Sequence, residues 1–149
     1  YMNNLKDDPT KLEPLMGKSY TISDDAKTID VTIRDGEKWS DGKPYTAEDV
    51  AYTFNLLNSN KALNTSGFAG SAKVLSDTEV RITLDKPESV NALSYLSGTM
   101  IVPKHVWEKI DDPVTYTNKD AVPQPLTRLR RIRTTGMKVS LKLMASVMF

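Results

Sequence analysis

The chain has 149 residues, of which 39% are hydrophobic and 26% are charged, and it contains no cysteine. This length is enough for one domain with a buried core, and the absence of cysteine excludes disulfides and cysteine-ligated metals. No apolar run approaches the length of a membrane span, and the net charge of +1 conceals an uneven distribution along the chain.

The first predicted element is a β-hairpin. Residues 19–22 and 28–33 alternate apolar and polar side chains, and the polar run 23–27 joins them. Alternation of this kind is typical of strands with one buried face. The expected inward side chains are Tyr20, Ile22, Ile29, Val31 and Ile33.

Residues 38–57 predict a turn followed by a capped amphipathic helix. Asp41 and Gly42 form a typical tight-turn pair. Thr46 is the expected N-cap of a helix over about 47–58, with Asp49 completing a short capping box. The side chains expected on its buried face follow helical spacing: Ala47, Val50, Ala51, Phe54 and Leu57.

A loop, a second hairpin and three short elements are expected after this helix. Residues 61–70 are small and polar and predict the loop, and the hairpin pairs 72–76 with 79–85. A short helix should follow Pro87 and stop at Gly98 in the C′ position. A short strand over 99–102 and a helix opened by Pro103 complete the pattern. Hairpins interleaved with helices, without a βαβ rhythm, predict an α+β fold on an antiparallel sheet.

No catalytic or metal-binding motif is present in the sequence. Glu48 and Asp49 are adjacent carboxylates, but neighbouring helical residues point apart, and their place in the first turn favours the helix dipole. The pairs at 24–25 and 111–112 lack the alternating oxygen ligands of a calcium loop. The single histidine, His105, has no accompanying nucleophile and is expected at the surface. We therefore predict no enzyme activity, no metal and no cofactor.

Three ordered motifs resemble the family 5 extracellular solute-binding proteins, the receptors of oligopeptide, dipeptide, nickel and oligosaccharide ABC importers. The run Lys-Trp-Ser-Asp-Gly at 38–42, with Pro44 and Thr-Ala-Glu-Asp-Val at 46–50, matches the family signature. Residues 78–87 resemble its hairpin arm, and Ile-Val-Pro-Lys-His-Val-Trp at 101–107 resembles one branch of the family. The resemblance covers roughly residues 12–122.

This resemblance implies most of a small subdomain in the first lobe of a two-lobed, type II periplasmic-binding-protein-like receptor. The implied function is capture of extracellular peptides, with ABC importer permease subunits as partners. The implied location is periplasmic or extracellular, with a lipoprotein-type membrane anchor supplied by a signal upstream of Tyr1. An oligosaccharide ligand is the alternative within the family. Because a ligand held between two lobes needs both walls, we expect this chain alone to bind little.

The candidate ligand-binding residues are Phe68, Ser97, Gly98 and Thr99. The resemblance places the segment after the signature helix, and the segment before Ile-Val-Pro-Lys, near the cleft between the lobes. Phe68 is included because its loop offers little helix or strand for it to pack against. Trp39 and Trp107 could stack on a ligand, but their positions in a strand and a helix favour core packing.

The composition changes at residues 122–123. Residues 1–122 hold 14 Lys and Arg against all 19 Asp and Glu, whereas residues 123–149 hold six basic residues and no acid. We expect 1–122 to be a receptor fragment and 123–149 a basic tail that is out-of-frame or disordered. Its charge also permits a different class of function, a small nucleic-acid or membrane-binding protein.

Overall fold

The structure is a computed structural model, and it describes residues 2–3, 12–13 and 15–117. Its strands are β1 (Met2–Asn3), β2 (Leu12–Glu13), β3 (Gly17–Ile22), β4 (Thr28–Ile33), β5 (Gly70–Ser76) and β6 (Glu79–Leu84). Its helices are α1 (Ala47–Ser59), α2 (Ser89–Gly98) and α3 (Lys104–Trp107). The predictions for 123–149 lie outside the described residues.

Strands β3 to β6 form a four-stranded sheet in the order β3-β4-β6-β5, and β1 pairs separately with β2. Every pairing is antiparallel. In the centre of the sheet Ile29 lies opposite Ile82 and Val31 opposite Val80, so both strands turn their apolar side chains to the same face. The two predicted hairpins and the α+β class are confirmed.

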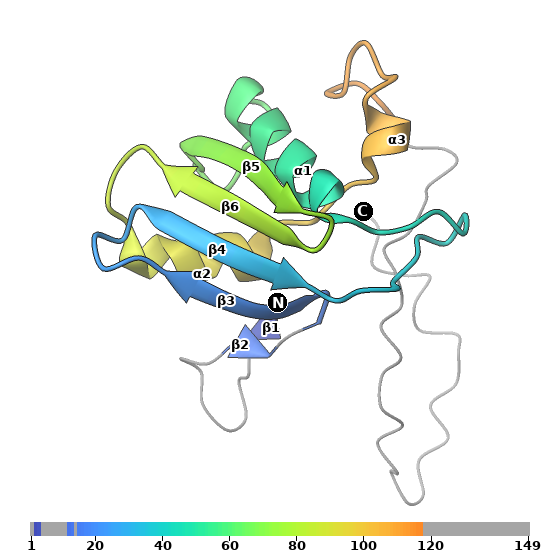
Figure 1. The fold of residues 1–149 in the computed structure, drawn as a ribbon. Helices are drawn as coiled ribbons and strands as arrows, with labels where there is room; N and C mark the ends of the chain where they lie inside the picture. The colour runs from blue at the N-terminus through green and yellow to red at the C-terminus, as the bar shows by residue number, and fades with distance from the viewer. Residues whose placement is uncertain (1, 4–11, 14, 118–149) are drawn as a thin grey trace, which may run out of the picture.

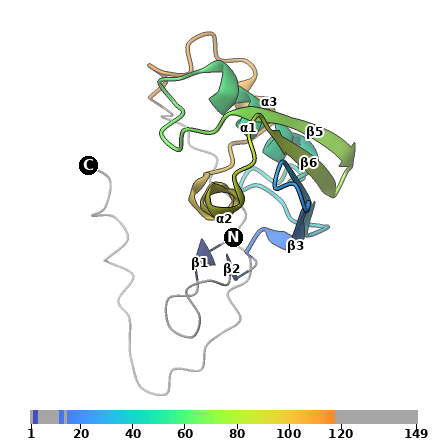
Figure 2. The same cartoon turned by 90° about the vertical axis from the view of Figure 1, so that its left-hand side faces the viewer.

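Both longer helices cover one face of the sheet (Figures 1 and 2). The buried core lies between these two layers. It combines alternate residues of β4 and β6 with apolar residues of α1 and α2, among them Ile29, Val80, Ile82, Phe54 and Tyr95. The predicted helix over 47–58 is therefore confirmed, with Phe54 as a central core residue at 2% exposure.

The opposite face of the sheet is polar. Asp30 on β4 lies across from Arg81 on β6, and the guanidinium donates two hydrogen bonds of 2.7 Å to the carboxylate. This bidentate contact lowers the pKa of Asp30. Both side chains are nearly half exposed, so the pair aligns the two strands and contributes little to stability.

The turn before α1 forms as predicted. Gly42 adopts a positive φ of 83° and donates its N–H to the Trp39 carbonyl at 2.9 Å. Thr46 and Asp49 form a capping box, in which Asp49 Oδ2 accepts the Thr46 N–H at 3.0 Å. The cap fixes where the helix begins.

Helix α1 is fastened to the edge strand β5 by Asn55. Its amide donates to the Ala72 carbonyl at 2.9 Å and accepts the Ala72 N–H at 2.8 Å. At the start of β5 the backbone of the neighbouring strand β6 lies very close to Gly70. A Cβ at this position would be 2.1 Å from the Thr83 carbonyl oxygen. Only glycine fits at this position.

The predicted strand over 99–102 is absent, and this segment forms no regular secondary structure. The Thr99 N–H bonds to the Tyr95 carbonyl of α2, and the Val102 N–H bonds to the Thr53 side chain of α1. Gly98 is the last residue of α2 rather than the C′ residue, and the C-cap is Thr99. Helix α3 has a single turn with Pro103 as its N-cap, so it is shorter than predicted.

Candidate ligand-binding site

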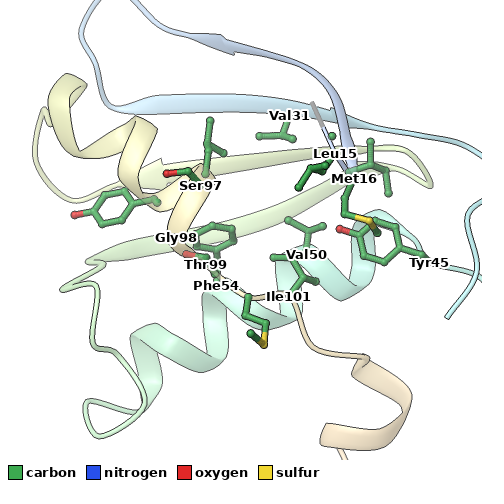
Figure 3. Close-up of a pocket in the computed structure, with 15 residues that line it drawn as sticks. Leu15, Met16, Val31, Tyr45, Val50, Phe54, Ser97, Gly98, Thr99 and Ile101 are labelled. Atoms are coloured by element: carbon green, nitrogen blue, oxygen red, sulfur yellow. The ribbon is translucent and has the colours of Figure 1, made fainter. Parts of the chain in front are cut away.

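Three of the four predicted site residues line one cavity. Ser97 and Gly98 end α2 and Thr99 follows them, and together they form one wall of a cavity of about 380 Å³ (Figure 3). The opposite wall is formed by residues 15–17 ahead of and at the start of β3. The cavity lies where the core between the sheet and the helices is incompletely filled.

The cavity has a buried base and an exposed rim. Val31 and Ile33 from β4 and Val50 and Phe54 from α1 form the base, each with 5% or less of its surface exposed. On the rim, Met100 is 76% exposed, and Gly98 is also exposed. A group of moderate size can therefore enter beside residues 98–100.

The polar atoms of the three predicted residues differ in their availability. The Ser97 hydroxyl donates to the Leu93 carbonyl at 3.0 Å, which is a bond within α2. Gly98 has open space where a Cβ would lie. The Thr99 hydroxyl oxygen is buried and has no hydrogen-bond partner among the residues that the structure describes. The Thr99 hydroxyl thus has no partner among the described residues, and its oxygen is also closed off from solvent.

Phe68 lies in the core, and the expectation that its loop would leave it without packing partners is wrong. Its ring is 2% exposed and packs edge-on between Phe54 at 4.9 Å and Tyr95 at 5.5 Å. The cause is Asn64, whose side chain donates to the Phe68 carbonyl at 2.6 Å and accepts the Phe68 N–H at 2.9 Å. These two bonds fold the loop and turn the ring into the core.

Asp49, which the sequence predicts only as part of the helix cap, is a buried carboxylate that joins two of the motifs. Asp49 is 4% exposed. Besides the Thr46 N–H, it accepts Trp39 Nε1 at 3.1 Å and the Lys104 N–H at 2.9 Å. Three donors from separate segments satisfy this buried charge, as a buried carboxylate requires.

Thr53 continues this connection one turn along α1. Its hydroxyl donates to the Asp49 carbonyl at 2.8 Å and accepts the Val102 N–H at 3.0 Å. We call Asp49 and Thr53, with their partners Trp39, Thr46, Val102 and Lys104, the motif junction. The junction fixes residues 102–104 against α1, and with them the segment that lines the cavity.

Two side-chain contacts reinforce the motif junction at the surface. Lys104 Nζ lies 2.9 Å from Glu48 Oε2, and His105 Nε2 lies 2.7 Å from Asp41 Oδ2. Glu48 and Asp49 thus face different partners, as expected from their adjacent helical positions. His105 is about three-quarters buried rather than fully at the surface.

Trp39 packs in the core as predicted, whereas Trp107 is only partly buried and packs edge-on against Tyr116.

A second, polar cavity of about 370 Å³ lies beside the motif junction. Its lining includes Lys104, His105, Glu48 and Asp49, whose charged groups already bond one another or neighbouring segments. In the part of the chain that the structure describes, no cluster of three or more His, Cys, Asp or Glu could hold a metal ion. This arrangement suits a structural connection and offers no nucleophile with a base.

The pKa of the core residue Tyr95 is raised above that of an ordinary tyrosine. Burial raises its pKa to about 12, and the Glu88 carboxylate, which accepts its hydroxyl at 2.6 Å, adds to the effect. The same hydrogen bond, with another from Asn91, lowers the pKa of Glu88. The pair anchors the N-cap of α2 to its second turn, and so supports the helix that carries Ser97 and Gly98.

Known proteins share both the sequence and the fold of this chain. It is 37% identical over 103 residues to the peptidoglycan-binding protein YepA of Agrobacterium fabrum, an alignment that covers 66% of this chain and 17% of YepA. It is 27% identical over 116 residues to the probable peptide-binding protein YejA of the same organism, covering 76% of this chain and 18% of that protein.

A solved structure agrees with the model over the same part of the chain. The periplasmic oligopeptide-binding protein of Thermotoga maritima matches with a TM-score of 0.66 and 27% identity, over 75% of this chain and 22% of that one. A second structure of that protein, with mannohexaose bound, matches with a TM-score of 0.61 and 26% identity, over 67% of this chain and 19% of that one. These neighbours confirm the type II periplasmic-binding-protein class.

The chain spans less than a fifth of the length of these curated relatives and less than a quarter of these solved chains. Residues 11–123 match the family described as bacterial extracellular solute-binding proteins, family 5, middle. This match covers most of the chain and includes both cavities, the motif junction and all three motifs identified in the sequence. The chain belongs to the family 5 extracellular solute-binding proteins.

Proposed function

We propose that this chain supplies one wall of a peptide-binding site in a receptor that delivers its ligand to an ABC importer. The observation that carries the proposal is the family match over residues 11–123. Members of this family are transport receptors and not enzymes, in agreement with the prediction from the sequence. The residues assigned to the ligand are Ser97, Gly98 and Thr99.

Peptide is the ligand class that the relatives favour. YejA is described as a probable peptide-binding protein and the Thermotoga protein as an oligopeptide-binding protein. The oligosaccharide alternative has the support of the mannohexaose-bound structure, and it is less favoured. The cavity beside residues 97–99 agrees with this preference because its base is apolar.

The nucleic-acid or membrane-binding alternative is not favoured. It depended on the basic residues of 123–149, which lie outside the described residues, whereas the family match covers the acidic part of the chain. Within the described residues, none of the helices has the length and apolar character needed to cross a bilayer. The proposed location is periplasmic or extracellular, with importer permease subunits and a membrane anchor as further parts of the same proposal.

Peptide binding can be tested by NMR on the full chain. We expect short oligopeptides of mixed sequence to shift the backbone amide signals of Ser97, Gly98 and Thr99. The affinity should be weak, because a ligand held between two lobes meets only one wall here. We expect a Kd of about 1 mM or more, and about 1 mM corresponds to a binding free energy of about −4 kcal/mol. Mannohexaose at the same concentrations serves as the carbohydrate comparison.

Two results would overturn the proposal. One is an absence of shifts at 97–99 at millimolar peptide while the amide spectrum remains that of a folded protein. The other is a response of these residues to mannohexaose alone, which would transfer the proposal to the oligosaccharide class. Shifts scattered over the polar face around Asp30 and Arg81 would also argue against residues 97–99 as the contact segment.

A further inference from the structure

Strand β5 forms one edge of the four-stranded sheet, and some of its backbone groups point away from the sheet. Hydrogen-bonded and non-bonded residue pairs alternate along an antiparallel ladder. The Asp85 N–H bonds to the Ala69 carbonyl at 3.0 Å, immediately before Gly70 pairs with Leu84. Gly70, and after it Ala72, therefore direct their N–H and C=O groups away from β6. Groups of this kind are the ones through which a further strand would add to the sheet.

Helix α1 runs beside β5 and meets these outward groups with asparagine side chains (Figure 1). The Asn55 amide donates to the Ala72 carbonyl at 2.9 Å and accepts the Ala72 N–H at 2.8 Å. A neighbouring strand supplies the same pair of bonds to one residue. Asn58, less than one turn further along α1, accepts the Gly70 N–H at 3.4 Å. The helix thus takes up hydrogen bonds that a fifth strand would use.

The remainder of the β5 edge carries features that oppose strand pairing and one that favours it. The register with β6 shifts between Val74 and Ser76, and an irregularity of this kind disrupts a regular ladder. Lys73 is exposed, and lysine on an edge strand discourages pairing with another chain. Leu75, however, is 46% exposed and offers apolar surface that an added strand would cover. The asparagine contacts are therefore needed most at Gly70 and Ala72, where the ladder is regular.

We propose that α1 serves as a side-chain cap on the edge of β5, and that Asn55 keeps this edge from pairing with the β5 edge of a second copy of the chain. A second copy fits because two identical edges can pair antiparallel about a two-fold axis, which gives each copy the same contacts. Asn55 is the main contributor, since it bonds both outward groups of Ala72. This inference concerns self-association and does not depend on the proposed function.

Amide hydrogen exchange in the unmodified chain gives the first test. Ala72 and Val74 both point away from β6, but within the described part of the chain the Val74 N–H has no partner corresponding to Asn55. We expect the Ala72 amide to exchange about tenfold or more slowly than the Val74 amide, after correction for neighbouring side chains. Equal corrected rates would overturn the cap. This measurement needs no variant, so it decides the matter even where a substitution impairs folding.

Asn55→Ala removes the cap directly. Alanine is a good helix former, and Asn55 is exposed, so the core is unchanged and the variant should remain folded. The Ala72 amide should exchange about tenfold or more faster than in the unmodified chain. In analytical ultracentrifugation, the weight-average mass should rise with protein concentration more steeply than that of the unmodified chain. A folded variant whose mass matches that of the unmodified chain at every concentration would overturn the proposal.

Two further variants assign the association to β5. Asn91→Ala is the matched control, because Asn91 is also an exposed helical asparagine and its amide donates to Glu88 on α2, away from the sheet edge. It should behave as the unmodified chain does. Adding Leu75→Lys to Asn55→Ala places a charge on the uncapped edge and should restore the mass of the unmodified chain. Association that persists in the double variant uses another surface, and this result would also overturn the proposal.

Discussion

The aromatic core and the motif junction hold the fold together by different means. In the core, the rings of Phe54, Phe68 and Tyr95 pack edge-on in series, and burial of apolar surface supplies the stability. At the motif junction, Asp49 and Thr53 connect α1 to residues 102–104 through hydrogen bonds. Apolar packing tolerates many similar side chains, whereas the junction depends on particular donors and acceptors. The comparison predicts that the two regions respond differently to substitution.

The largest effect is expected in the core. Phe54→Ala should cost about 3–5 kcal/mol in the free energy of unfolding, because Phe54 is 2% exposed and contacts Phe68 directly. A domain's entire stability is about 5–15 kcal/mol, so the variant should be largely unfolded near its former midpoint. Urea unfolding followed by circular dichroism measures this loss.

Glu48→Gln is the control for this substitution. Glu48 lies in the first turn of the same helix, its side chain is 60% exposed, and its single ion pair is with Lys104. Loss of that pair should cost well under about 1 kcal/mol. Similar losses for Phe54→Ala and Glu48→Gln would contradict the orientation of α1.

The motif junction should give the next largest effect. Asp49→Ala leaves three donors without their acceptor: Trp39 Nε1 and the N–H groups of Thr46 and Lys104. We expect a loss of about 3 kcal/mol, since each buried donor left unpaired costs about 1–3 kcal/mol and water can reach some of them. Asp49→Asn, which keeps one acceptor oxygen and the shape, should lose less than half as much.

Chemical denaturation of both variants, followed by circular dichroism, tests the junction. The two variants should differ from each other by more than the error of the measurement. If Asp49→Ala unfolds at the same denaturant concentration as the unmodified chain, the junction contributes no stability. The segment 97–101 would then be held by the core alone.

The contrast between the regions also explains what the sequence could predict. The hairpins and α1 follow from alternating and helical apolar spacing, which is local information, and these elements appear as expected. The segment 99–102 has the composition of a strand, but the Val102 N–H bonds to Thr53, 49 residues away, and the neighbouring Lys104 N–H bonds to Asp49, 55 residues away. No local pattern contains that information.

The candidate site shows the same division. Ser97, Gly98 and Thr99 were placed by family resemblance and do line one cavity. The packing of Phe68 was not predicted because the loop 61–70 has no periodic signal, while its conformation depends on two hydrogen bonds between Asn64 and Phe68. The Asn64 and Phe68 pair, four residues apart in a polar loop, is the signal that could have indicated a folded turn.

Stability should decline in alkali more steeply than for a protein with exposed tyrosines. The pKa of Tyr95 is raised in the folded state from 10.0 to about 12, so its contribution is complete below pH 10 and is lost as the pH rises through about 12. Tyr95→Phe should remove part of this alkaline loss. Thermal midpoints of both proteins across this range give the comparison, and parallel curves would show that Tyr95 does not titrate as the structure requires.

Tyr95 should also affect stability in acid, because its hydroxyl lowers the pKa of Glu88. The pKa of Glu88 is lowered below 4.5, chiefly by the Tyr95 hydroxyl, so its contribution is present above that value and lost as the pH falls through the lowered pKa. Tyr95→Phe removes the donor, and the acid loss specific to this pair should diminish. Because Glu88 is only partly buried, whereas Tyr95 is 3% exposed, the acid effect should be smaller than the alkaline one.

The smallest effect on stability is expected from removal of the basic tail, residues 123–149. We propose that this tail adds nothing to the stability of the fold. Residues 123–149 carry six basic side chains and no acidic one, and the family match ends at residue 123. A variant ending at Val122 should therefore have the thermal midpoint of the full chain, or a slightly higher one, because it lacks apolar residues such as Leu141, Leu143 and Phe149.

A nucleic-acid-binding tail predicts a different result: tight binding of duplex DNA or RNA with a steep salt dependence that truncation abolishes. Weak binding alone does not distinguish the two, since a charge of +6 attracts any anionic polymer. Sub-micromolar affinity at physiological salt, or a clear fall in the midpoint on truncation, would show that the tail has a partner and that the fold does not depend only on the aromatic core and the motif junction.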